Sequence, residues 1–199
     1  MKIKLPKEHL SHSQIQCVLQ SPQEYIQRYL YGVKRESSIQ QEYGTKITDI
    51  LEGRVKPSKT LDNALKNVPR YKMTDKEIKC VLSRKFLEVT LLGRLDGGEI
   101  DGSQGEYKTG MAPWTQKRAD ESLQLRIYAL IEYKNTGKIP KQSLTWLPTA
   151  WDGAEVFLKG EPITFSVQSA VKEMLETEVI VWKAYDKIIS LIENEYSKI

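Results

Sequence analysis

Cysteine is scarce in this chain, which has only Cys17 and Cys80 among its 199 residues. The two lie far apart and form no spaced motif, so neither a disulfide framework nor a cysteine-rich zinc site is indicated. An iron–sulfur cluster held by four cysteines is excluded. We expect both thiols to be small apolar or helix-face groups, compatible with a reducing compartment.

Long apolar segments are missing as well. No apolar run approaches the roughly 18 residues that a membrane helix needs, and the start, Met1-Lys2-Ile3-Lys4-Leu5-Pro6, is too short and too charged for a secretory signal. We therefore expect a cytoplasmic protein without a membrane span. The chain also has no Gly-x-x-x-x-Gly-Lys-Ser/Thr loop, so any ATP-driven step requires a partner.

The composition that remains is that of an ordinary globular protein, with 40% hydrophobic and 28% charged residues. This length predicts one domain, 1–199. The net charge of +4 permits nucleic-acid binding without requiring it. Two basic groups have aromatic neighbours, and basic side chains can follow phosphates while aromatic rings stack on unpaired bases. The candidates for such contacts are Arg28, Lys34 and Arg35 in one group and Trp114, Lys117 and Arg118 in the other.

Periodicity divides the chain into a mainly helical annex, 1–84, and a mixed α/β core with a C-terminal helix, 85–199. Apolar residues at helical spacing, a break at Ser21-Pro22, and the capping-box pattern from Thr74 to Glu77 indicate the helices. The expected helices are 12–31 in two parts, 37–51, 74–83, a long helix from 115 or 118 to 135, and 168–196. The expected strands are 85–95, 98–101, 104–108, 143–147, 155–158 and 163–166.

Charged residues gather at the ends of two of these strands. Asp96 precedes a Gly-rich turn, and Glu106 and Lys108 follow it at a hairpin's length. Side chains two apart on a strand share a face, so Glu106 and Lys108 point together while Tyr107 turns away. Two carboxylates and an ammonium then meet in a small volume. Hard oxygen ligands suit Mg²⁺ or Mn²⁺, so the set is typical of metal-dependent phosphodiester cleavage.

Gln124 and Tyr128 lie four apart on the following helix and therefore face the same way. Each piece has an alternative interpretation: Asp96 as a turn residue, the Glu-x-Lys pair as a solvated face, and Tyr128 as a core residue. The order of the pieces, rather than any one of them, favours a catalytic site.

In this order the residues resemble the PD-(D/E)XK nuclease superfamily, in its RecB-type and lambda-exonuclease-type branch, from about residue 11 to 146. Ser13-Gln14-Ile15 and the aromatic helix after Pro22 match the start of that pattern. The resemblance implies a restriction-endonuclease-like α/β fold: a mixed central sheet flanked by helices, an N-terminal helical annex and a long C-terminal helix. It also implies that Asp96 and Glu106 are metal ligands, that Lys108 is the catalytic lysine, and that Gln124 and Tyr128 form the family's Gln-x-x-x-Tyr signature.

The chain departs from the family at two places. Ser21 stands where many relatives have cysteine, and Thr48 stands where the Gly-Thr-x-x-His motif has histidine. Threonine is a poor metal ligand. Glu52, one helical turn beyond Thr48, could reach the same face and bind the metal instead, although an exposed helix-end glutamate fits the sequence equally well.

The resemblance therefore implies a Mg²⁺- or Mn²⁺-dependent DNA nuclease without the iron–sulfur cluster of CRISPR-associated relatives. We expect an exonuclease or end-processing enzyme of repair, recombination or phage replication. Its substrate would be DNA that is single-stranded or has free ends, and its partners a recombinase, helicase or single-strand-binding protein. The alternative is a noncatalytic nucleic-acid-binding protein that kept the fold, for which Thr48 is the main argument. For a sequence-specific endonuclease we find no supporting pattern.

Overall fold

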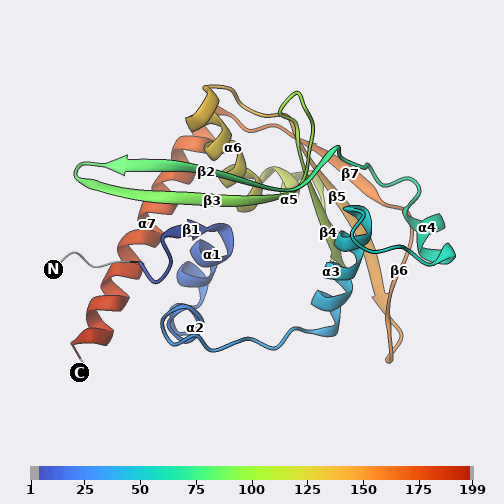
Figure 1. Ribbon diagram of the computed structural model, residues 1–199, viewed down its shortest axis with the longest axis horizontal. Coiled ribbons are helices and arrows are strands. Elements are labelled where there is room, and N and C mark those ends of the chain that lie inside the picture. The colour runs from blue at the N-terminus through green and yellow to red at the C-terminus, as the bar shows by residue number, and fades with distance from the viewer. Residues whose placement is uncertain (1–4, 198–199) are drawn as a thin grey trace.

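The structure, a computed structural model, describes residues 5–197, so the charged start at residues 1–4 lies outside it. A seven-stranded sheet forms the centre, in the order β1-β3-β4-β5-β6, with β2 added beside β3 and β7 beside β5 (Figure 1). β1 with β3 and β4 with β5 are parallel, and the other pairs are antiparallel. The strands are β1 (His9–Ser11), β2 (Met73–Arg84), β3 (Leu87–Gly98), β4 (Gln104–Gly110), β5 (Gln142–Trp151), β6 (Val156–Leu158) and β7 (Ile163–Val167).

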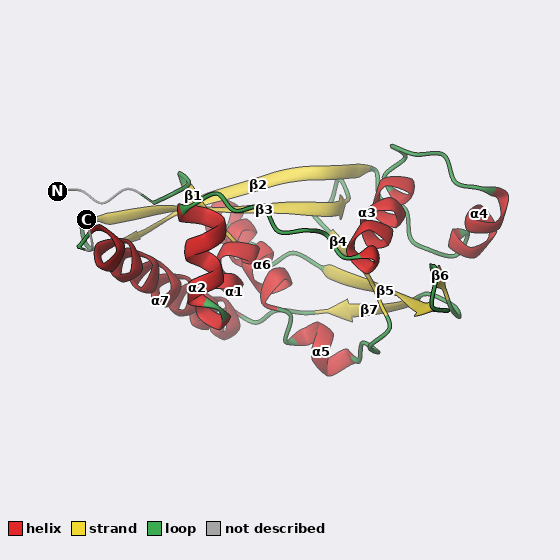
Figure 2. Ribbon diagram, turned by 90° about the horizontal axis from the view of Figure 1, so that it is seen from below, coloured by secondary structure: helices red, strands yellow, loops and turns green. Residues whose placement is uncertain are grey.

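Helices cover the sheet on both faces (Figure 2). They are α1 (His12–Gln20), α2 (Pro22–Tyr25) with its π-helical continuation η1 (Ile26–Leu30), α3 (Ile39–Leu51), α4 (Lys59–Leu65), α5 (Gln116–Asp120), α6 (Leu123–Thr136) and α7 (Val171–Tyr196). The larger core joins α1, α6 and α7 to the sheet and contains Leu144 of β5. The smaller core joins α3 and α4 to Tyr107 and Leu147. The strands β4 and β5 are therefore held between two cores.

These features confirm the expected fold class, a mixed α/β core with helices before it and a long helix at its end. Pro22 opens α2 and separates it from α1, as predicted. Ser38 and Gln41 form a capping box that starts α3. Gly137 ends α6 with a left-handed φ of 71°, a conformation that glycine adopts without strain. The predicted segments 143–147, 155–158 and 163–166 are confirmed as β5, β6 and β7.

The segment 74–83 is a strand, β2, and the predicted helix is wrong. Its buried residues, Ile78, Cys80 and Leu82, alternate with less buried ones, which is the period of a strand. Asp75 has a φ of 55°, outside the range of a right-handed helix, and its carboxylate accepts a hydrogen bond from Arg94 of β3. Pairing with β3 thus outweighed the local capping pattern. The helical part of the annex ends at Leu65, and β2 belongs to the central sheet.

Three smaller differences concern boundaries and short elements. Residues 99–103 form a turn rather than a strand, closed by the Glu99 N–H, which donates to the Ser103 carbonyl over 2.9 Å. The long helix predicted from 115 or 118 is two helices, because Ser122 adopts an extended conformation between α5 and α6. The short elements β1 and α4 were not predicted. No helix within residues 5–197 is both long and apolar enough to span a membrane.

Candidate active site

The strands β3 and β4 separate where the first two candidate residues lie. They pair only through Gly97 with Gly105 and Gly98 with Gln104. Asp96 and Glu106 stand next to these pairs, at the point where the ladder ends. There the Asp96 carboxylate takes the place of a strand partner, because its Oδ2 accepts the Tyr107 N–H over 2.9 Å. The fork brings the two carboxylates together from different strands.

The glycines at this fork make room for Tyr71. A Cβ added at Gly97 or at Gly105 would collide with the Tyr71 ring. The ring centroids of Tyr71 and Tyr107 lie 5.5 Å apart, and the Tyr71 hydroxyl lies 2.9 Å from the Ser143 Oγ. This packing fixes the strand pair immediately beside Asp96 and Glu106.

Lys108 and Glu106 point the same way, as the alternation of β4 predicted. Lys108 Nζ donates to Glu106 Oε1 over 2.5 Å and to Gln124 Oε1 over 2.8 Å. Gln124 Nε2 donates in turn to Glu106 Oε1 over 2.6 Å and to the Tyr128 hydroxyl over 2.7 Å. The Tyr128 hydroxyl donates to the Arg94 carbonyl over 2.6 Å. The structure therefore brings all five predicted catalytic residues, Asp96, Glu106, Lys108, Gln124 and Tyr128, into one network.

Gly93 lets the tyrosine reach that position. A Cβ at Gly93 would lie 2.7 Å from the Tyr128 ring and 3.2 Å from Ile78. Tyr128 can therefore lie directly on β3 and anchor α6 to the strand that carries Asp96.

Burial dominates the protonation of the carboxylates. The Glu106 side chain is 3% exposed, and burial raises its pKa to about 7 against the opposing charge of Lys108. Burial also raises the pKa of Asp96, although the Tyr107 N–H and the Lys108 charge oppose the rise. For Lys108, burial alone would lower the pKa, but Glu106 and Asp96 outweigh it and raise the pKa above the ordinary lysine value. Lys108 is therefore held as an ammonium ion.

The carboxylates fit a divalent cation of the Mg²⁺ or Mn²⁺ kind. Within residues 5–197, Glu106 Oε2 is buried without a hydrogen-bond partner, which is costly for a carboxylate unless a further ligand satisfies it. No three His, Cys, Asp or Glu side chains of these residues lie close enough to hold a metal ion. Mg²⁺ commonly takes one or two protein carboxylates and completes its shell with water and substrate phosphate. Asp96 and Glu106 match that limited donor set.

Glu52, the third predicted ligand, has a different partner in the structure. Its side chain is 2% exposed and forms an ion pair with Arg54. Arg54 also pairs with Asp49 over 3.2 Å, and its charge acts to lower the pKa of Asp96. Glu52 is thus buried near the site rather than exposed at a helix end. Its role as a metal ligand stays a prediction.

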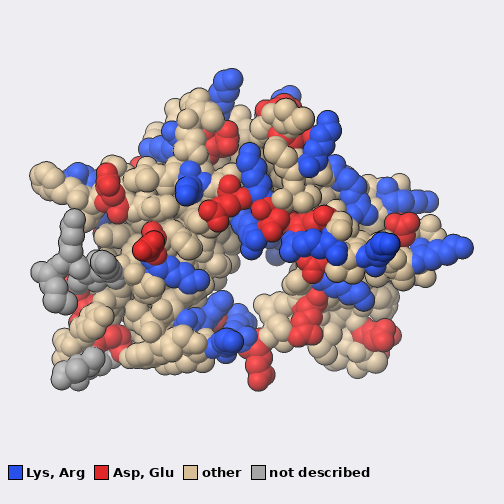
Figure 3. Space-filling view, viewed as in Figure 1, with Lys and Arg blue, Asp and Glu red and all other residues tan. Residues whose placement is uncertain are grey.

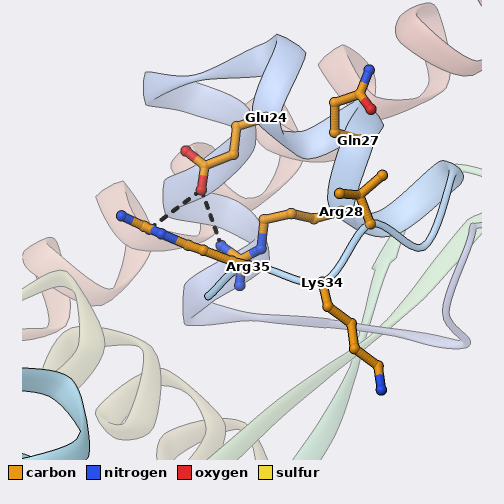
Figure 4. A pocket seen from close by; sticks show the side chains of 6 residues that line it. Glu24, Gln27, Arg28, Lys34 and Arg35 are labelled. Atoms are coloured by element: carbon orange, nitrogen blue, oxygen red, sulfur yellow. Dashed lines mark hydrogen bonds and ion pairs between the residues drawn. The ribbon is translucent and has the colours of Figure 1, made fainter. Parts of the chain in front are cut away.

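The basic groups lie outside the carboxylate network. Arg28 and Arg35 each place an Nη1 within 3.4 Å of Glu24 Oε1, and Lys34 extends away from that carboxylate (Figure 4). The three basic residues line a hollow of about 280 Å³. On α5 and the loop before it, the Arg118 guanidinium stacks 4.2 Å from the Trp114 ring centroid, and Lys117 lies 3.9 Å from Glu121. Their DNA contacts stay predictions.

Two residues near the site were not predicted. His12 opens α1, and burial together with the charge of Lys108 lowers its pKa to about 4, which places its neutral imidazole near the lysine. The chain has only two histidines, and that rarity was an available signal. Tyr71 had none, because its place beside the fork depends on β2 being a strand.

Comparison with known proteins gives relatives by structure alone. No family model and no curated protein matches the sequence. The fold is similar to the crystal structure of a putative exonuclease from Eubacterium rectale, with a TM-score of 0.62 and 13% identity over 94% of this chain and 82% of that one. It is also similar to the crystal structure of SSO0001, with a TM-score of 0.52 and 14% identity over 92% of this chain and 76% of that one. At these identities the likeness concerns the fold.

Proposed function

We propose that this protein is a metal-dependent DNA nuclease that hydrolyses phosphodiester bonds at strand ends. The observation that carries the proposal is the buried Glu106 carboxylate, which has one oxygen held by Lys108 and Gln124 and the other without a partner. The similarity in fold to a putative exonuclease supports it. Repair, recombination or phage replication would be the setting.

Asp96 and Glu106 would hold Mg²⁺ or Mn²⁺, which when bound polarises the phosphate and lowers the pKa of a coordinated water. The chain's own residues prepare the site. Lys108 uses two of its three N–H donors on Glu106 and Gln124, which leaves one for a phosphate oxygen or the attacking water. Because its pKa is raised, Lys108 contributes positive charge and orientation rather than accepting the proton.

Gln124 and Tyr128 would act by positioning. The Gln124 amide holds the lysine and Glu106 at fixed relative places, and Tyr128 holds the amide. Geometry maintained in this way lowers the cost of organising the site during reaction. Glu52 would add a ligand from α3, and His12 adds a neutral imidazole near Lys108.

Incubation with end-labelled linear DNA tests the proposal, with single and double strands compared in Mg²⁺, Mn²⁺ or EDTA. We expect mononucleotides or short products to accumulate from linear strands with either cation and none in EDTA. Undegraded DNA under all conditions would contradict the proposal.

The alternative, a noncatalytic DNA-binding protein, is favoured by Thr48 and by the limited donor set of the site. It predicts DNA binding that is equal with and without divalent metal, and no cleavage. Binding assays run beside the cleavage assay separate the two functions.

A further inference from the structure

Residues 31–38, which we call the strap, connect η1 to α3 without forming a helix or strand. Figure 1 shows the strap along the lower side of the molecule, opposite the sheet. In the same view Figure 3 shows the background between these two parts, framed by basic and acidic side chains. The strap thus closes an opening, the passage, which has α1 and α2 on one side and α3 on the other.

Hollows follow the strap along this passage. One of about 510 Å³ is lined by Ser13 and Cys17 of α1 and by Ser37 and Gln41 at the other side. A second of about 430 Å³ shares Ser37 and Gln41 and continues along α3. Volumes of about 300–1,000 Å³ accept small organic ligands. Each hollow therefore suits an unpaired nucleotide rather than a duplex.

The walls of the passage reach the candidate active site at β4. Ser13 follows His12, whose imidazole lies close enough to Lys108 to be affected by its charge. On the opposite wall, Gly44 lies one turn from Gln41, and a Cβ added there would be 2.7 Å from the Thr109 Oγ1. A strand in the passage would therefore run past Lys108 and Thr109.

Polar contacts hold both ends of the strap. At the first end, Arg35 of the strap pairs with Glu24 of α2 over 3.3 Å, and Arg28 shares the same oxygen over 3.4 Å. At the second end, the Ser37 hydroxyl donates to Glu42 over 2.5 Å. Exposed ion pairs of this kind are weak and are screened by salt. The strap is closed but openable.

We infer that the passage takes one DNA strand by its free end and that the strap retains the strand beside Lys108. The inference rests on the proposed function and explains a requirement for ends. A closed loop of chain can be threaded only by an end, and the hollows exclude paired strands. Arg28, Lys34 and Arg35 then face the phosphates at the strap.

Strand trapping tests this without cleavage. A fluorescent single strand with biotin at both ends is bound in EDTA, streptavidin is added, and dissociation is followed after dilution into excess competitor. We expect the caps to slow dissociation at least about tenfold. A protease recognition sequence inserted between Gly32 and Val33 should allow release when the strap is cut. The same insertion at Gly153, in the turn between β5 and β6, should not.

Glu24→Gln provides a milder variant should the insertion disturb folding. It should shorten the residence time of the capped strand by about two- to fivefold, the range of an exposed ion pair, whereas Glu121→Gln should leave it unchanged. Caps that do not slow dissociation, cutting that does not release the strand, or a lack of strand binding would each overturn the inference. Because EDTA prevents catalysis, these outcomes are distinct from a failure of nuclease activity.

Discussion

At the scale of single residues, the Gln124 amide determines how the site is organised. Its oxygen accepts from Lys108, and its nitrogen donates to Glu106 and Tyr128. An amide has distinct donor and acceptor ends, so these partners fix its orientation. The lysine and the glutamate are thus held by a residue on another element.

Gln124→Ala should lower kcat by about 100-fold with little change in KM, because loss of the amide misplaces groups that act in the transition state. Tyr128→Phe should have a smaller effect, since it keeps the ring on Gly93 and removes only the hydroxyl. Steady-state cleavage of a labelled strand measures both, with Gln116→Ala on α5 as the matched control. A Gln124→Ala enzyme with wild-type kcat would contradict the positioning role.

Glu106 should make the metal-free protein less stable as the pH rises. Burial raises its folded-state pKa from 4.5 to about 7, so its contribution to stability is complete below 4.5 and is lost as the pH rises through 7. The expected loss is on the order of 3 kcal/mol. Urea unfolding in EDTA between pH 4.5 and 8 measures this. Glu106→Gln should flatten the profile and the exposed Glu121→Gln should not; identical profiles for wild type and Glu106→Gln would refute it.

At the scale of elements, the fork between β3 and β4 depends on the close approach of Tyr71. Gly105→Ala should destabilise the protein by about 1–3 kcal/mol through overpacking against that ring. Gly110→Ala is the matched control on the same strand, because nothing lies within 4 Å of a Cβ added there. Tyr71→Ala should remove most of the penalty of Gly105→Ala in a double-mutant cycle. Additive free energies of unfolding would show that the ring and the strand are not coupled.

The helix α3 is expected to contribute to metal binding through Glu52. Glu52→Ala should raise the Mn²⁺ concentration for half-maximal cleavage by several-fold while leaving the maximal rate nearly unchanged. Thr48→His should lower that concentration, because imidazole is a better ligand than a hydroxyl. Rates measured against Mn²⁺ concentration would show both effects. Curves that neither substitution moves would mean that α3 takes no part in metal binding.

At the scale of the whole molecule, patterns that depend on near neighbours were predictable from the sequence. The alternation along β4 placed Glu106 with Lys108, and the four-residue spacing placed Gln124 with Tyr128. Features that depend on distant pairing were not. Thr74 to Glu77 has a helical capping pattern, but Ile78, Cys80 and Leu82 are buried in alternation because β2 pairs with β3. Tyr71 and His12 reach the site only through that three-dimensional arrangement.

The most direct test of the central claim, that Asp96, Glu106 and Lys108 form one metal-dependent site, is single-turnover cleavage of an end-labelled linear strand in Mn²⁺. Wild type is compared with Asp96→Asn, Glu106→Gln and Lys108→Ala, each checked for folding by circular dichroism and for DNA binding. We expect each variant to lose about 10³-fold or more in rate while still folding and binding, because the members of one catalytic unit fail together. A folded variant of any of the three that cleaves at a near-wild-type rate would contradict the account.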